Sequence, residues 1–107
     1  MNTQKKLSDA PLDVMERSAG EAEAMLKLLA NRHRLLILCH LVKGAKSVGE
    51  LNDTLNLSQS ALSQHLAKMR EQGLISADKQ GQQVYYAIKD PKVGAILSTL
   101  YLMYCNT

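Results

Sequence analysis

The chain has 107 residues, of which 46% are hydrophobic, and its formal net charge is +3. A chain of this length can bury one hydrophobic core but not two, which predicts a single domain. The longest apolar run, residues 35–42, is interrupted by a histidine and is too short to cross a bilayer, and no signal-peptide pattern opens the chain. We therefore expect a cytoplasmic protein.

The charges are unevenly distributed along the chain. Residues 7–30 hold two basic side chains against five acidic ones, whereas residues 31–107 hold nine basic against five acidic. This division suits a chain whose later part contacts a polyanion, although mildly basic domains without such a partner are also common.

Two helices are expected in the first half of the chain. Apolar residues at spacings of three and four predict a long amphipathic helix over residues 12–30, preceded by a flexible tail over residues 1–11. Asn31 can cap a second helix over residues 32–43, which is apolar on nearly every side and should be the central core helix. We interpret the isolated His40 in it as a structural or interfacial residue rather than a ligand.

A helix-turn-helix is predicted next. Ser47 and Glu50 match the capping box, so a short helix should begin there and end near Asn56. After a turn of a few residues, the segment 58–70 has its apolar residues on one face of a second helix. In this layout the second helix is presented to the major groove of DNA.

The opposite face of the helix over residues 58–70 is polar near its start, where such helices meet DNA bases. The expected base contacts are Gln59, Ser60, Ser63, Gln64 and His65. Of these, His65 has the alternative of packing under the helix. The expected phosphate contacts are Lys68, Arg70 and Lys79. An ordinary amphipathic surface helix would show the same polar face, so the neighbouring segments decide the interpretation.

A β-hairpin is expected after this helix, with strands over residues 74–79 and 83–88. Gly81 supplies the turn between them, because glycine adopts positive φ without steric cost. The hairpin would form a wing. Its tip residues expected to reach phosphate or the minor groove are Lys79, Gln82 and Gln83. Exposed polar residues are also the ordinary finding at a hairpin tip.

Asp90-Pro91 opens a final helix, because proline is favoured at the first helical position. The fold class is therefore mainly α, a winged helix-turn-helix of five main helices with a small hairpin, spanning residues 12–107. The first and last helices offer more apolar surface than the other elements can cover, which predicts a homodimer. Its paired recognition helices should lie about 34 to 36 Å apart on an inverted-repeat operator. In the monomeric alternative these surfaces complete the core.

Other functional classes fit the sequence less well. Ser63 and His65 are two residues apart on a helix and point apart, and neither an oxyanion-hole pattern nor a catalytic carboxylate pair is present, so we expect no enzyme. The three histidines lack the ligand spacing of a tetrahedral metal site, so no metal or other cofactor is expected. A winged helix that binds protein rather than DNA remains an alternative.

The two cysteines have an inert interpretation on the residues alone. Cys39 lies on an apolar stripe with Leu35 and Val42, as a packing residue would. Cys105 stands at the end of a helix, where the negative pole of the macrodipole disfavours a thiolate. Both would then be structural residues.

Three segments carry a family resemblance: LLANRHRLLILCHL, SVGELNDTLNLSQSALSQHLAKMREQGLI and GQQVYYAI. From about Glu21 onward the chain resembles the ArsR family of winged-helix regulators, and within it the HlyU, BigR and SqrR group of dithiol sensors. Arsenic-sensing relatives carry CVC where this chain has Ser47 and Gly49 around a valine, and zinc-sensing relatives use a histidine in the last helix, which this chain lacks. The resemblance therefore implies no metal site.

The resemblance does imply a function for the thiols, since Cys39 and Cys105 stand in the helices that carry the sensor pair. It implies a dimeric, repressor-type DNA-binding protein whose operator affinity is altered by oxidation or persulfidation of both cysteines, with a small oxidant or sulfane-sulfur donor as inducer. A disulfide needs Cα atoms within roughly 7 Å, a limit that a polysulfide link would relax. Such a link would change the angle between the subunits.

Overall fold

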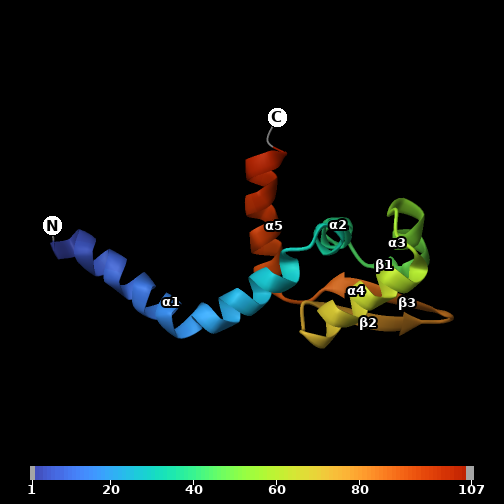
Figure 1. Ribbon diagram of the computed structural model, residues 1–107, viewed down its shortest axis with the longest axis horizontal. Coiled ribbons are helices and arrows are strands. Elements are labelled where there is room, and N and C mark those ends of the chain that lie inside the picture. The colour runs from blue at the N-terminus through green and yellow to red at the C-terminus, as the bar shows by residue number, and fades with distance from the viewer. Residues whose placement is uncertain (1, 106–107) are drawn as a thin grey trace. The chain divides into compact units, whose positions relative to one another are not determined.

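The computed structural model describes residues 2–105, with side chains described for residues 11–105. The helices are α1 (Asn2–Leu29), α2 (Arg32–Leu41), α3 (Val48–Thr54), α4 (Gln59–Glu71) and α5 (Pro91–Tyr104), and the strands are β1 (Lys46–Ser47), β2 (Ile75–Gln80) and β3 (Gln83–Ile88) (Figure 1). The predicted fold class, five helices with a small wing, is confirmed. The chain divides into two units, residues 1–31 and residues 32–107.

The first unit consists of α1 and the two residues that follow it. The helix begins at Asn2 rather than at residue 12, so the predicted start is wrong, and Pro11 lies inside the helix. The apolar spacing does not show this start because it begins only at residue 12. The predicted flexibility of residues 1–11 stays a prediction, because the side chains of residues 1–10 lie outside the described part of the structure.

One face of α1 is apolar and exposed. Met15, Ala19, Ala22 and Leu26 line a shallow groove along this helix. The side chains of Met15 and Leu26 are 55% and 58% exposed, and Leu12 and Val14 are also exposed.

The hydrophobic core of the second unit draws on four helices and the start of the wing. Its fully buried side chains are Ile37, Leu38, Leu51, Leu62, Leu66, Met69, Ile75, Val93 and Leu97. The helix α2 contributes one face to this core, whereas Leu36 and Val42, within and just after it, are 45% and 46% exposed. The helix is therefore part of the core, as predicted, through Ile37, Leu38 and Leu41, while part of its apolar surface is exposed.

The helix-turn-helix forms as its capping residues predict. The Ser47 N–H donates to Glu50 Oε1 at 3.0 Å, and the Glu50 N–H donates to Ser47 Oγ at 3.2 Å, which completes the capping box of α3. The helix ends at Thr54, two residues before the predicted end. Ser58 caps α4 by accepting a hydrogen bond from the Ala61 N–H at 3.1 Å. The turn between the two helices spans residues 55–58.

A Schellman motif joins α4 to the wing. Gly73 adopts φ 79°, its N–H donates to the Arg70 carbonyl, and the Leu74 N–H donates to the Met69 carbonyl at 2.9 Å. The Leu74 carbonyl then accepts hydrogen bonds from the N–H groups of Lys89 and Asp90. The two ends of the hairpin are therefore tied together where the chain leaves α4 and enters α5.

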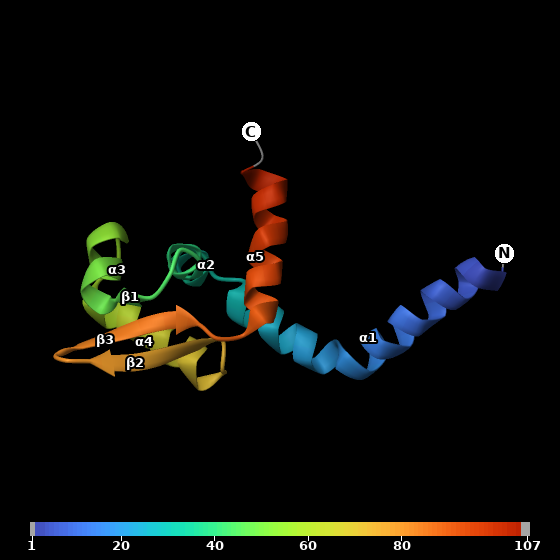
Figure 2. The same cartoon turned by 180° about the vertical axis from the view of Figure 1, so that it is seen from behind.

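The wing is one part of a three-stranded antiparallel sheet with strand order β1-β3-β2. Gln80 pairs with Gln83, and Gly81 adopts φ 63° in the two-residue loop between them, which confirms the role predicted for this glycine. The strand β1 pairs with the other edge of β3. The sequence does not predict this pairing, because β1 is only two residues long. The tip of the hairpin projects away from α5 (Figure 2).

The last helix begins as predicted. The Asp90 Oδ1 atom accepts a hydrogen bond from the Lys92 N–H at 2.9 Å, and Pro91 takes the first helical position. In the first half of α5 the side chains of Val93 and Leu97 are buried. Near its end, Leu102 and Met103 are 71% and 63% exposed. Within the described residues, no helix has the length and apolar character that a bilayer span requires.

Candidate DNA interface and thiol pair

The outward face of α4 carries most of the predicted DNA contacts. The 3.6-residue period places Ser60, Gln64 and Lys68 opposite the buried face of the helix, with Gln59 and Ser63 to one side. All five are exposed, and so is Arg70 in the last turn. Among the described residues, these side chains have no hydrogen-bond or ion-pair partner. Their donors and acceptors are therefore available to a ligand.

The wing tip supplies a second exposed polar surface. The residues predicted to contact phosphate or the minor groove are all exposed, namely Lys79, Gln82 and Gln83. Such contacts require exposed side chains. The Gln80 Nε2 atom donates to Asp78 Oδ2 at 3.1 Å, which holds these two side chains together beside the tip. The positive charge at the tip comes from Lys79.

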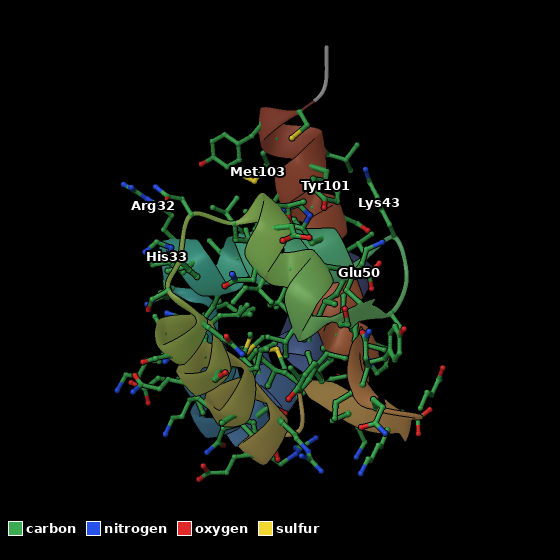
Figure 3. The ribbon with its side chains drawn as sticks, turned by 90° about the vertical axis from the view of Figure 1, so that its right-hand side faces the viewer. Arg32, His33, Lys43, Glu50, Tyr101 and Met103 are labelled. Atoms are coloured by element: carbon green, nitrogen blue, oxygen red, sulfur yellow. The ribbon has the colours of Figure 1, made fainter. Side chains whose placement is uncertain are left out.

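His65 lies apart from the other predicted base contacts. Its Nδ1 atom accepts a hydrogen bond from Arg34 Nε at 3.2 Å, and its ring centroid lies 5.8 Å from that of His33. His33 projects from the start of α2 on the side of the molecule where α4 lies (Figure 3). Burial, and then the charges of Arg34 and His33, lower the pKa of His65 from 6.5. His65 therefore contacts α2 through Arg34, a contact that the sequence did not single out, and its predicted base contact stays a prediction.

The two cysteines flank one tyrosine. Cys39 is half-buried in α2, Cys105 is exposed at the C-cap of α5, and both are free thiols. A side-chain hydrogen bond with Cys39, then burial, then the charges of Cys39 and Cys105 raise the pKa of Tyr101 to about 12. Two thiols that are 66 residues apart in sequence (105 − 39) thus both contribute to the pKa of one tyrosine.

Tyr101 was not among the site residues that the sequence predicted. Its spacing carries a signal, since Tyr101 and Cys105 are four residues apart and share one helix face. The Cys105 N–H donates to the Tyr101 carbonyl at 2.8 Å, which extends the helical pattern to the cysteine. Ser98, Tyr101, Leu102 and Cys105 line an open groove of about 440 Å³.

No group of three or more histidine, cysteine, aspartate or glutamate side chains is placed to hold a metal ion within residues 11–105. The candidate site consists of the polar face of α4, the tip of the wing, and the two cysteines with Tyr101.

The chain matches proteins of known sequence and structure over most of its length. The model of the arsR family of bacterial regulatory proteins matches residues 25–77. The chain is 45% identical over 102 residues to the transcriptional activator HlyU of Vibrio cholerae, with 94% of each protein covered.

Solved structures agree with this match. Reduced HlyU from Vibrio cholerae superposes with a TM-score of 0.80 at 46% identity, covering 85% of this chain and 96% of that one. The transcriptional repressor BigR from Xylella fastidiosa superposes with a TM-score of 0.82 at 34% identity, covering 87% of this chain and 95% of that one. The chain therefore belongs to the ArsR family of bacterial regulatory proteins and is a DNA-binding transcriptional regulator with a winged helix-turn-helix fold.

Proposed function

We propose that the protein is a homodimeric repressor that binds an inverted-repeat operator through α4 and the wing, and that modification of Cys39 and Cys105 by oxidation or persulfidation lowers its operator affinity. The observation that supports the switch is that Cys39 and Cys105 both contribute to the raised pKa of Tyr101.

The DNA-binding part of the proposal depends on the unpartnered side chains of α4. Glutamine and serine donate and accept hydrogen bonds, which is the chemistry that base edges in the major groove recognise. Lys68 and Arg70 follow on the same helix and would contact phosphate, and Lys79 would do so from the wing. The base contacts we propose are Gln59, Ser60, Ser63 and Gln64.

The homodimer is supported by apolar surface that a monomer leaves in water. Large side chains are exposed on α1 at Met15 and Leu26 and on α5 at Leu102 and Met103. A chain of 107 residues rarely exposes this much apolar surface unless another subunit covers it. Sedimentation equilibrium should give the mass of a dimer, and Met103→Glu should weaken the association. Ser76→Glu, an equivalent charge change on an exposed strand residue, should not.

Coupling between the thiols and DNA binding would act through α2 and α5, the helices associated with the two cysteines. Cys39 lies in α2 and Cys105 at the end of α5, so a covalent link between them joins the core to the proposed dimer helix. A small change in the angle between the subunits then displaces one recognition helix relative to the other, so both no longer fit consecutive major grooves. A coupling free energy of about 1 to 3 kcal/mol is ordinary for such regulation.

A DNA-binding experiment in two redox states tests the proposal. Genomic fragments that bind the reduced protein are selected, and their affinity is measured before and after treatment with glutathione persulfide or peroxide. We expect affinity to fall about 5- to 150-fold on treatment of wild type, and Cys39→Ser and Cys105→Ser proteins to keep the affinity of the reduced state. If both variants respond as wild type does, the cysteines are structural and the proposed switch is wrong. A reduced protein that binds no fragment at low salt would instead favour a protein-binding winged helix.

A further inference from the structure

We propose that Arg34 is a positioning residue for DNA recognition: its hydrogen bond to Nδ1 of His65 fixes the rotation of α4 about its axis, so that base contact requires a neutral His65 imidazole. This inference rests on the proposed contact of α4 with bases. It adds to that contact a residue outside the helix-turn-helix and a dependence on pH.

His65 lies on a flank of α4, between its buried face and its polar face. The buried face consists of Leu62, Leu66 and Met69, whereas Gln64 on the polar face is exposed and His65 is half-buried. Burial of apolar side chains is non-directional, so it fixes how deeply α4 packs more closely than it fixes the rotation of the helix. A hydrogen bond on the flank is directional and can fix that rotation.

The donor of this hydrogen bond belongs to a helix of the core. Arg34 stands in the first turn of α2, and Ile37 and Leu38 in the next turn are fully buried. The Arg34 Nε atom lies 3.2 Å from His65 Nδ1, and the ring centroid of His33 lies 5.8 Å from that of His65. The flank of α4 is thereby joined to α2 by two neighbouring side chains.

A small rotation of α4 is enough to disturb base contacts. Side chains reach about 5 to 6 Å from a helix axis, so a rotation of about 10° moves their ends by about 1 Å. Hydrogen-bond distances vary by only about 0.5 Å, whereas the attraction between a basic side chain and phosphate falls off over about 10 Å. Loss of the hydrogen bond between Arg34 and His65 should therefore weaken sequence-specific binding much more than binding to random DNA.

Protonation of His65 removes the acceptor that Arg34 requires. Burial, and then the charges of Arg34 and His33, lower the pKa of His65 from 6.5, so the imidazole is neutral at pH 7 and above. Recognition should weaken as the pH falls below 6.5.

Other charged groups stand on α4 and on the elements that pack against it, α3 and β2. They are not among the causes of the lowered pKa of His65, and they are Lys68, Arg70 and Glu71 on α4, Glu50 and Asp53 on α3, and Asp78 and Lys79 on β2. The pH dependence is therefore assigned to His65 and its two neighbours in α2.

Affinity for two duplexes across pH tests the inference. The probes are a genomic fragment selected with the reduced protein and a random duplex of equal length, and fluorescence anisotropy is read from about pH 8 to about pH 5.5. The ratio of the two affinities isolates recognition, because a proton gained near phosphate strengthens binding to both duplexes. In wild type this ratio should fall about 2- to 10-fold toward the acidic end, as expected for one lost hydrogen bond.

Two substitutions of His65 form a matched pair. The Oδ1 atom of asparagine is as many bonds from Cα as Nδ1 of histidine, so His65→Asn keeps an acceptor that does not titrate, whereas His65→Ala removes it. Alanine favours a helix more than asparagine does, so weaker recognition by His65→Ala cannot come from helix propensity. At about pH 8 the affinity ratio of His65→Asn should exceed that of His65→Ala about 2- to 10-fold, and both pH profiles should be flat.

A second pair assigns the effect to Arg34. Glutamine places Nε2 as many bonds from Cα as Nε of arginine, so Arg34→Gln keeps a donor that Arg34→Met lacks, at equal charge and similar helix propensity. Arg34→Gln should therefore recognise the selected fragment better than Arg34→Met. Arg34→Met should also have a much smaller effect in a His65→Ala background than in wild type, because the partner is already absent.

Three results would overturn the inference. They are a wild-type pH profile in His65→Asn, equal affinity ratios in Arg34→Gln and Arg34→Met, and additive losses in Arg34→Met and His65→Ala. Circular dichroism at each pH confirms that every variant is folded. If Arg34→Met does not fold, the pH profiles of wild type and His65→Asn still decide, because both keep the acceptor at neutral pH.

Gln64→Ala distinguishes failure of this inference from failure of the proposed function. If it lowers the affinity ratio and the variants of Arg34 and His65 do not, α4 contacts bases and the role of Arg34 is wrong. If none of these variants changes the ratio, the proposed contact of α4 with bases is wrong as well.

Discussion

The Nε atom of Arg34 in α2 lies 3.2 Å from the Nδ1 atom of His65 in α4 and donates a hydrogen bond to it. The ring of His33 lies against the same histidine. The start of α2 is thereby joined to the recognition helix through a contact that requires an unprotonated Nδ1 on His65. Protonation of this imidazole would remove the acceptor and place a second positive charge beside Arg34.

Stability should therefore depend on pH through His65. Its pKa is lowered in the folded state from 6.5, chiefly by burial, so protons bind the unfolded chain in preference. The free energy of unfolding should be greatest above pH 6.5 and should fall as the pH falls through this value toward the lower pKa of the folded state. Urea denaturation from about pH 8 to about pH 5 measures this dependence. His65→Gln should flatten the curve; identical curves for wild type and His65→Gln would contradict the assignment.

Replacement of Gln64 by alanine should lower sequence-specific affinity. Gln64 is exposed on the outward face of α4, and loss of a bidentate amide contact to a base costs about 1 to 3 kcal/mol. Fluorescence anisotropy with operator and random duplexes should show a loss on the operator and a relaxed preference at one base position. Gln72→Ala, at the C-cap of the same helix, is the control. Equal losses on both duplexes would assign Gln64 to the backbone instead.

Replacement of Lys79 by alanine should weaken binding to every sequence alike. A lysine at the wing tip that contacts phosphate contributes about 0.9 to the slope of log affinity against log salt concentration. Salt titrations of operator and random DNA should both lose this part of the slope. Lys43→Ala, an exposed lysine after α2, serves as the matched control. An unchanged slope in Lys79→Ala would remove the wing tip from the interface.

Replacement of Ser47 by alanine should destabilise the fold before it affects recognition. Ser47 is 4% exposed and provides half of the capping box of α3. Loss of such a cap costs about 0.5 to 2 kcal/mol of the free energy of unfolding. Chemical denaturation measures this loss, with the exposed Ser76→Ala as control. A midpoint equal to that of wild type would show that the cap does not stabilise α3.

Much of the site could be predicted from the sequence because its signals are local. Ser47 and Glu50 mark the start of α3, Gly81 marks the hairpin, and Asp90-Pro91 marks the start of α5; the structure confirms each one. Exposure of the polar face of α4 also followed from the helical period alone. These features depend on residues only a few positions apart, which sequence patterns describe well.

Other features required the tertiary structure. The hydrogen bond of His65 with Arg34 depends on α2, which begins more than thirty positions earlier in the chain. The strand β1 forms only through its pairing with β3, which lies almost forty residues later in the chain. The part of α1 before residue 12 could not be predicted because it lacks an apolar pattern. The exposed and buried faces of α2 are both apolar, so composition does not distinguish them.

By itself, the sequence determined the helix-turn-helix, the wing and the exposed polar face of α4, because capping, turn chemistry and apolar periodicity act over a few residues. The tertiary structure alone decided that Cys39 contributes to the raised pKa of Tyr101 and that His65 accepts a hydrogen bond from Arg34 in α2. Those pairings join residues far apart in the chain, and only the packing of α2 against its neighbours brings them within reach of one another.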